Sequence, residues 1–173
     1  MLDPNGDMTR AEMAAIINRS FGCYAKADIS KYKDVSKDKW YFEDVAMAVQ
    51  MGTYNGRSNS SMAPDAPITR QEAMTVVARA LELDYDSYSK AELTQFSDAG
   101  KVSNWAMPYV RAMVGADYIH GRGKVLAPQD NITRAEFAQI FYNIIGTYIV
   151  SKGSYDKDMK GNVLIRTNDV ELK

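Results

Sequence analysis

One short motif occurs three times in this chain, and each copy has the form of a helix start. Thr-Arg-x-Glu stands at residues 9–12, 69–72 and 133–136, with each threonine five residues after a proline. Such a threonine accepts a hydrogen bond from the amide three residues on, and the glutamate at that position reaches back to the threonine's own amide. We therefore predict three capped helices, each beginning at the arginine of its motif.

Apolar residues follow each motif at spacings of three and four, which marks one face of an α-helix. The three ladders are Met13, Ile16, Ile17 and Phe21; Ala73, Val76, Val77 and Leu81; and Phe137, Ile140, Phe141 and Ile145. Gly22 and Gly146 directly follow the first and third ladders, and glycine is the residue that most often closes a helix. We expect those two helices to end at these glycines.

A second predicted helix precedes two of the three motifs. Residues 39–52 and 104–117 align with Trp40 on Trp105, and each stretch lies between an aromatic-x-Asp sequence and a glycine turn. The motif arginines are about 60 residues apart, and repeats of that size usually stack to bury a shared core. The chain thus contains the second half of one repeat at residues 1–30 and two whole repeats at 31–86 and 87–150.

Residues 151–173 do not follow the repeat. The stretch GNVLIRTNDVELK alternates apolar and polar residues about a Thr-Asn-Asp turn, which is typical of a strand or hairpin. So short a β segment is not stable alone, and it either opens a following domain or packs on the helices as an edge element. The fold class predicted from these patterns is all-α, with a short β-like C-terminal tail.

Composition excludes several classes of function. The 21 basic and 22 acidic residues balance, so no electrostatic reason exists to expect nucleic acid or a membrane surface as partner. A single cysteine, Cys23, and a single histidine, His120, argue against an intrachain disulfide and most metal sites. The segment Asp3–Asp7 fails as a calcium loop because its twelfth position is Ala14 rather than glutamate. No cofactor, metal ion or membrane insertion is expected.

The motif arginine is the residue that capping does not explain. It places a cation at the positive end of the helix dipole, which costs roughly 0.3–1 kcal/mol. A solvated arginine paired with a nearby glutamate is one interpretation. The other is an anion site, because a guanidinium beside helix N-terminal amides offers several donors to a carboxylate. The position after the arginine changes from Ala11 to Gln71, whereas the arginine does not change.

These residues resemble the S-layer homology (SLH) family over roughly residues 1–150. The family pattern is an aromatic-x-Asp-Val start, a Trp-Ala helix, a glycine turn, a proline and then Ile-Thr-Arg-Ala-Glu. The stretches FSDAGKVSNWAMPYV and ITRAEF match it almost throughout, and YKDVSKDKWYFEDV and ITRQEA match it well. The first repeat lacks its front helix, and Trp-Tyr replaces Trp-Ala in the second.

The resemblance implies a pseudo-threefold bundle with grooves between the repeats, which anchors secreted proteins to the bacterial cell wall or S-layer. The expected ligand is a secondary cell-wall polysaccharide, commonly one that bears a pyruvate ketal. The carbohydrate-binding residues carried over by the motif are Arg10, Arg70 and Arg134, with the greatest weight on the last two. Trp40 and Trp105 correspond to the groove tryptophan that stacks on a sugar, although a plain core tryptophan fits the same pattern.

Other interpretations remain open at this point. Arg57 and Arg122, just after the turn glycines, either reach a groove or are solvated loop residues, and the second interpretation is favoured. A self-association module, in which a neighbouring chain completes the first repeat and forms a homo-oligomer, is the alternative to an anchor. An enzyme would need a pair of groove carboxylates; no such pair is marked, so the chain is not expected to be an enzyme.

Overall fold

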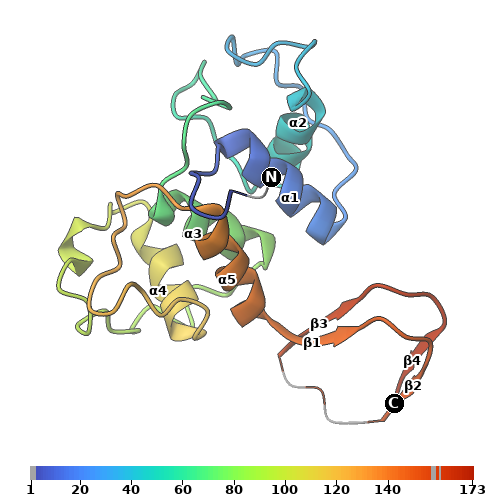
Figure 1. Cartoon of the computed structure of the whole chain (residues 1–173). Helices are drawn as coiled ribbons and strands as arrows, with labels where there is room; N and C mark the ends of the chain where they lie inside the picture. Colours follow the sequence, from blue (N-terminus) through green and yellow to red (C-terminus); the bar gives the residue numbers. More distant parts are fainter. Residues whose placement is uncertain (1–2, 157–158, 160) are drawn as a thin grey trace.

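The computed structural model describes residues 3–156, 159 and 161–173. Within them the chain forms five α-helices, one 3₁₀ turn and four short strands (Figure 1). The helices are α1 (Arg10–Phe21), α2 (Phe42–Gln50), α3 (Arg70–Ala80), α4 (Met107–Gly115) and α5 (Arg134–Ile144), with the 3₁₀ turn at Ala99–Lys101. The strands are β1 (Ile145–Ile149), β2 (Gly153–Tyr155), β3 (Asn162–Ile165) and β4 (Val170–Leu172).

The three predicted helix starts are confirmed. Helices α1, α3 and α5 begin at the motif arginine, and both hydrogen bonds of the capping box are present in each. The first helix ends as predicted, because Gly22 adopts the left-handed conformation with φ 69°. The prediction for Gly146 was wrong. Ile145 already has extended backbone angles after α5, and Gly146 lies inside β1 because the chain continues directly into a strand.

The three motif segments meet at one centre. The amide of Met8 donates to the carbonyl of Ile132 at 3.0 Å, that of Ile68 to Met8 at 2.9 Å, and that of Ile132 to Ile68 at 3.0 Å. These three bonds close a ring, and the three side chains are at most 1% exposed. The helices α1, α3 and α5 therefore start around a common pseudo-threefold point, which fixes their arginines in equivalent places.

The outer helices pack on the inner ones in pairs, α2 on α1 and α4 on α3 (Figure 1). An aspartate from each aromatic-x-Asp sequence holds the loop that leads to the next motif. The carboxylate of Asp34 accepts from the amides of Met62 and Ala63, and that of Asp98 accepts from Leu126 and Ala127. Each repeat thus ties its start to its own second half through one carboxylate.

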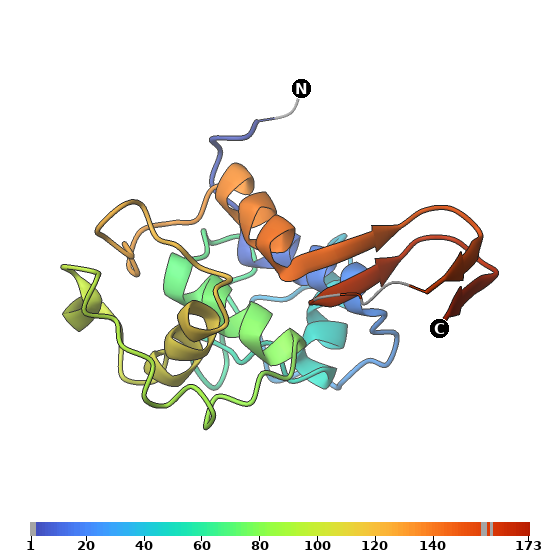
Figure 2. The same cartoon turned by 90° about the horizontal axis from the view of Figure 1, so that it is seen from below.

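The all-α prediction was wrong, because the C-terminal part forms two small parallel sheets. Strand β1 pairs with β3, and β2 pairs with β4, so that the two sheets form an arm projecting from the end of α5 (Figures 1 and 2). Residues 161–173 form strands, which was one of the two predicted possibilities, but not a hairpin, since β3 and β4 pair with residues 145–155 and not with each other. Strand β1 was not predicted, because the apolar spacing of α5 continues to Ile145, the first residue of the strand. The isoleucines, threonine and tyrosine of β1 favour extended structure.

Candidate functional site

The motif arginines form a closed ring of ion pairs between the repeats. Each guanidinium reaches the capping glutamate of another repeat, not the one in its own motif. The pairs are Arg10–Glu72 at 3.1 Å, Arg70–Glu136 at 2.9 Å and Arg134–Glu12 at 2.6 Å. Each glutamate therefore caps its own helix and also neutralises an arginine from elsewhere in the sequence, which couples helix capping to the packing of the repeats.

The amides at the helix starts are not available to an anion, contrary to the sequence-based expectation. In α1, Arg10 donates its amide to the carbonyl of Ala66 at 3.0 Å, and Ala11 donates to Pro64 at 2.9 Å. Helices α3 and α5 repeat this arrangement with the loops before their neighbours' motifs. The third amide donates to the capping threonine. An anion at these places would meet side chains only.

The three arginines differ in how far they are buried. The side chains of Arg10 and Arg70 are only 6% exposed, whereas that of Arg134 is 40% exposed. Arg10 also donates to the carbonyls of Met62 and Asn55, and burial lowers the pKa of both Arg10 and Arg70, with partial compensation by their neighbouring carboxylates. Arg134 is therefore the motif arginine with the most surface for a ligand.

The turn arginines join the same ion pairs. Arg57 and Arg122 are exposed loop residues, as one interpretation expected, but each also contacts a capping glutamate. Arg57 lies 3.1 Å from Glu72, and Arg122 lies 2.6 Å from Glu136. Burial alone would raise the pKa of Glu136. The hydrogen bond from Arg122, the capping amide and the charges of the two arginines outweigh burial and lower that pKa to about 2. The same kinds of contact lower the pKa of Glu72.

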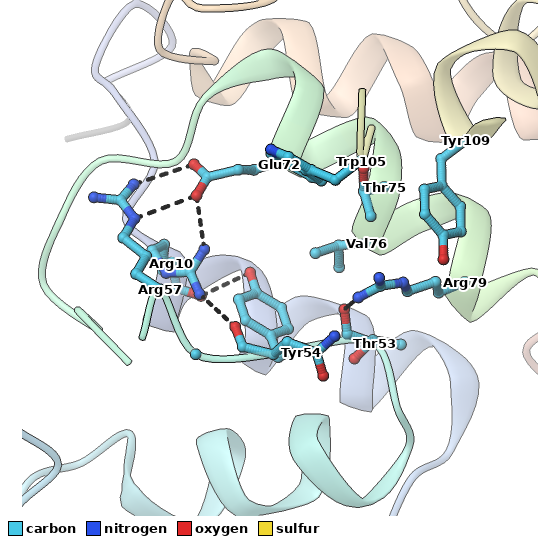
Figure 3. Close-up of a pocket in the computed structure, with 12 residues that line it drawn as sticks. Arg10, Thr53, Tyr54, Arg57, Glu72, Thr75, Val76, Arg79, Trp105 and Tyr109 are labelled. Atoms are coloured by element: carbon cyan, nitrogen blue, oxygen red, sulfur yellow. Dashed lines mark hydrogen bonds and ion pairs between the residues drawn. The ribbon is translucent and has the colours of Figure 1, made fainter. Parts of the chain in front are cut away.

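Two of the three pairs open onto a hollow beside a tryptophan. The Trp105 hollow, of about 590 Å³, contains Arg10 and Glu72 (Figure 3), and the Trp40 hollow, of about 430 Å³, contains Arg134 and Glu12. The two are equivalent grooves of the repeat. Glu72, Thr75, Val76, Arg79 and Trp105 line the first where Glu12, Ala15, Ile16, Arg19 and Trp40 line the second. Arg70 lines neither hollow.

Both tryptophans lie at the surface, so they are not core residues. Trp40 is 60% exposed and Trp105 is 52% exposed, and each stands two residues before the first residue of its outer helix. An indole face left open beside a guanidinium suits a sugar ring that bears an acidic group. The structure thus brings Trp105 together with Arg10 and Trp40 together with Arg134, and leaves Arg70 without a tryptophan in the described part of the chain.

Three residues of the Trp105 hollow were missed by the sequence reasoning. Tyr54 lies under the Arg10 guanidinium, 5.0 Å from ring centroid to Cζ, and its hydroxyl donates to the Arg10 carbonyl at 3.0 Å. Arg79 and Tyr109 form a second cation–aromatic pair at 4.8 Å. The signal for Arg79 was present, because Arg19 stands at the same place after the first motif.

Two kinds of site find no support in the part of the chain that the structure describes. No three histidine, cysteine, aspartate or glutamate side chains are grouped as metal ligands would be. None of the described helices is both long enough and apolar enough to span a membrane.

Comparison with known proteins places this geometry in a family. The pattern of the S-layer homology domain matches residues 31–74 and 95–138, which together make up more than half of the chain. Each match contains one tryptophan, one turn arginine and one complete Thr-Arg-x-Glu motif.

Similar sequences occur in S-layer proteins and in an enzyme. A surface-layer 125 kDa protein of Lysinibacillus sphaericus is 34% identical over 83% of this chain and 12% of that protein. An amylopullulanase of Thermoanaerobacterium thermosulfurigenes is 31% identical over 83% of the chain and 8% of that protein. An S-layer protein of Bacillus thuringiensis subsp. finitimus is 25% identical over 96% of this chain and 18% of that protein.

The chain therefore spans between about a twelfth and a fifth of the length of these relatives. The names of the surface-layer protein and the S-layer protein agree with the predicted location at a bacterial cell surface. The resemblance noted in the sequence is confirmed: this chain belongs to the S-layer homology domain family.

Proposed function

We propose that this chain attaches a bacterial surface protein to the cell wall without a covalent bond, by binding an anionic wall polysaccharide in the two hollows. The relatives support an attachment role, because a similar segment occurs in S-layer proteins and in an amylopullulanase, which are otherwise different kinds of protein. A segment shared between proteins with such different activities is better explained by where they are held than by a reaction of its own.

The observation that carries the proposal is the charge of the Trp105 hollow. Arg10, Arg57 and Arg79 line it, and Glu72 is its one lining carboxylate (Figure 3). Positive charge beside an exposed indole matches a sugar with an acidic substituent, because the ring stacks on the aromatic face while a guanidinium binds the carboxylate. A pyruvate ketal is the substituent that the family resemblance suggests.

The five residues singled out in the sequence take different roles in this proposal. Arg134 and Arg10 contribute the cationic wall of the two hollows, and Trp40 and Trp105 are the stacking surfaces. Arg70, buried against Glu136 and away from both hollows, holds the repeats in place and contacts no sugar. The Trp40 hollow is the more apolar of the two, so we expect its affinity for the polysaccharide to depend mainly on Arg134.

The test is a titration of purified wall polysaccharide, with and without its acidic groups, against the wild-type chain and Arg134→Ala. Wild type should bind the intact polymer and lose most of its affinity for the polymer without acidic groups. Arg134→Ala should bind the intact polymer about tenfold more weakly, which corresponds to one charged hydrogen bond of roughly 1.5 kcal/mol. Equal binding of both polymers by wild type would rule out recognition of the anion.

Self-association is a second candidate, and the Trp40 hollow favours it. Its lining includes Phe137, Phe141 and Ile16 beside the 60%-exposed Trp40. A neighbouring chain that covered these side chains would form an oligomer. Light scattering over a wide concentration range distinguishes the two candidates, because an anchor that acts alone stays monomeric and a self-association module gains mass.

A further inference from the structure

Arg79 differs from the other cations of the Trp105 hollow in having no acidic partner. Arg10 and Arg57 share the carboxylate of Glu72, at 3.1 Å each. Within the described residues, Arg79 forms no ion pair. Its guanidinium lies over the ring of Tyr109 at 4.8 Å, and its one hydrogen bond is a long one of 3.4 Å to the carbonyl of Thr53. Most of its donors are left for a ligand.

The two cationic groups stand at opposite ends of the hollow. Figure 3 shows Arg10, Arg57 and Glu72 together at one end and Arg79 with Tyr109 at the other, with Thr75 and Val76 between them. Thr75 and Val76 are at most 4% exposed, and the Thr75 hydroxyl donates to the carbonyl of Gln71, so neither residue offers a ligand a charge or a free hydroxyl. A ligand that met both ends would have to extend along the hollow.

The equivalent position in the Trp40 hollow is neutralised. There Arg19 takes the place of Arg79, but Asp44 takes the place of Tyr109 in the outer helix, and its carboxylate lies 3.8 Å from the Arg19 guanidinium. The Arg19 side chain is also 73% exposed. The same repeat therefore carries an unpaired cation in one groove and a paired, solvated cation in the other.

We propose that Arg79 and Tyr109 form a second anion-binding position, so that the Trp105 hollow binds an acidic oligosaccharide with negative groups on two different sugar residues. Arg79 binds the second carboxylate or phosphate, and the ring face of Tyr109 holds the guanidinium in position. The Trp40 hollow lacks this position and binds one acidic group only. This inference rests on the proposed function, since it takes the ligand to be an acidic wall polysaccharide.

The experiment compares wall-polysaccharide fragments of one and of two repeating units, both with their acidic groups intact, by isothermal titration. Wild type should bind the longer fragment about tenfold more tightly, the advantage expected of one further charged hydrogen bond. Arg79→Gln should remove that advantage, so that it weakens binding of the longer fragment much more than binding of the shorter one. Arg79→Lys, which keeps the charge, should retain part of the advantage.

Arg19→Gln is the matched control, because Arg19 occupies the equivalent place in the Trp40 hollow, and it should keep the full advantage. Thermal unfolding of Arg79→Gln should match wild type, because the side chain makes no buried ion pair. A wild type that binds both fragments equally, or an Arg79→Gln variant that keeps the advantage, overturns the second position and leaves the anchoring function standing. A wild type that binds neither fragment overturns both proposals.

Discussion

The guanidinium of Arg134 lies 2.6 Å from the carboxylate of Glu12, although 122 residues separate them in the sequence. This contact joins the last inner helix to the first and closes the ring of arginine–glutamate pairs. The ring is not uniform. Glu72 and Glu136 each receive two arginines, whereas Glu12 receives one among the described residues. The contribution of each pair to stability should differ accordingly.

Glu136→Gln should destabilise the chain more than Glu12→Gln. Glutamine can still cap the helix, so each substitution removes mainly the charge. We expect a loss of about 2–4 kcal/mol at Glu136, where the buried Arg70 loses its counter-charge and Arg122 keeps only Asp130, and about 0.5–1.5 kcal/mol at the more exposed Glu12. Urea unfolding measures both. Equal losses would mean that the second arginine adds nothing.

Stability should fall in acid over a defined range. The pKa of Glu136 is about 2 in the folded chain against an ordinary value of 4.5. Between these values the unfolded chain binds a proton that the folded chain does not, so the contribution is complete above pH about 4.5 and is lost as the pH falls through about 2. Urea unfolding at a series of pH values measures this slope.

Glu136→Gln supplies the control for the acid range. The variant lacks the titrating group, so its free energy of unfolding should fall less steeply than that of wild type between those pH values. Glu72 and Glu12 contribute to the slope that remains, together with aspartates such as Asp34 and Asp98, because the pKa values of all these groups are also lowered. Parallel curves for wild type and variant would show that Glu136 titrates normally in the folded chain.

Local rules in the sequence accounted for much of the helical part. Capping chemistry fixed the starts of α1, α3 and α5 because Thr and Glu act within four residues of each other, and the spacing of apolar residues located their buried faces. The alternation in residues 161–173 indicated the strands β3 and β4, but their pairing escaped prediction because strand pairing is non-local. The partners of β3 and β4 lie in residues 145–155. The apolar spacing up to Ile145 predicted that the helix extends to the start of this stretch.

The residue types of the candidate site could be read from the sequence, but the contacts between them could not. Sequence spacing indicated that Arg10, Arg70 and Arg134 are equivalent, yet the hollows distinguish them, since Arg70 is buried away from both. That difference depends on which tryptophan and which turn pack against each arginine, and those contacts cross between repeats. The role of Arg79 was missed for the same reason, because only the fold shows that Tyr109 packs against it where Asp44 pairs with Arg19.

Arg70→Ala and Arg134→Ala should separate stability from binding. Arg70 is 6% exposed and pairs with Glu136, so its removal should cost about 2–4 kcal/mol and leave the polysaccharide affinity of the folded chain unchanged. Arg134 is 40% exposed, so its removal should cost about 1 kcal/mol or less and weaken binding. Urea unfolding and polysaccharide titration of both variants give the comparison. A binding loss confined to Arg70→Ala would reverse the assignment.

The two tryptophans allow each hollow to be observed separately, because the sequence contains no others. In Trp40→Phe the remaining emission comes from Trp105, and in Trp105→Phe it comes from Trp40. Both side chains are more than half exposed, so either substitution should change stability by less than about 1 kcal/mol. Addition of the acidic polysaccharide should shift the emission of each variant to shorter wavelength, as a sugar ring replaces water on the indole.

Combining these variants with Arg134→Ala assigns the signals to the hollows. Arg134 lines the Trp40 hollow but not the Trp105 hollow. Its removal should therefore move the response of Trp40 to about tenfold higher polysaccharide concentration and leave that of Trp105 unchanged. A polymer that binds while both indoles keep their emission would place the carbohydrate outside these hollows, since a sugar seated beside Arg10 or Arg134 would cover the neighbouring ring.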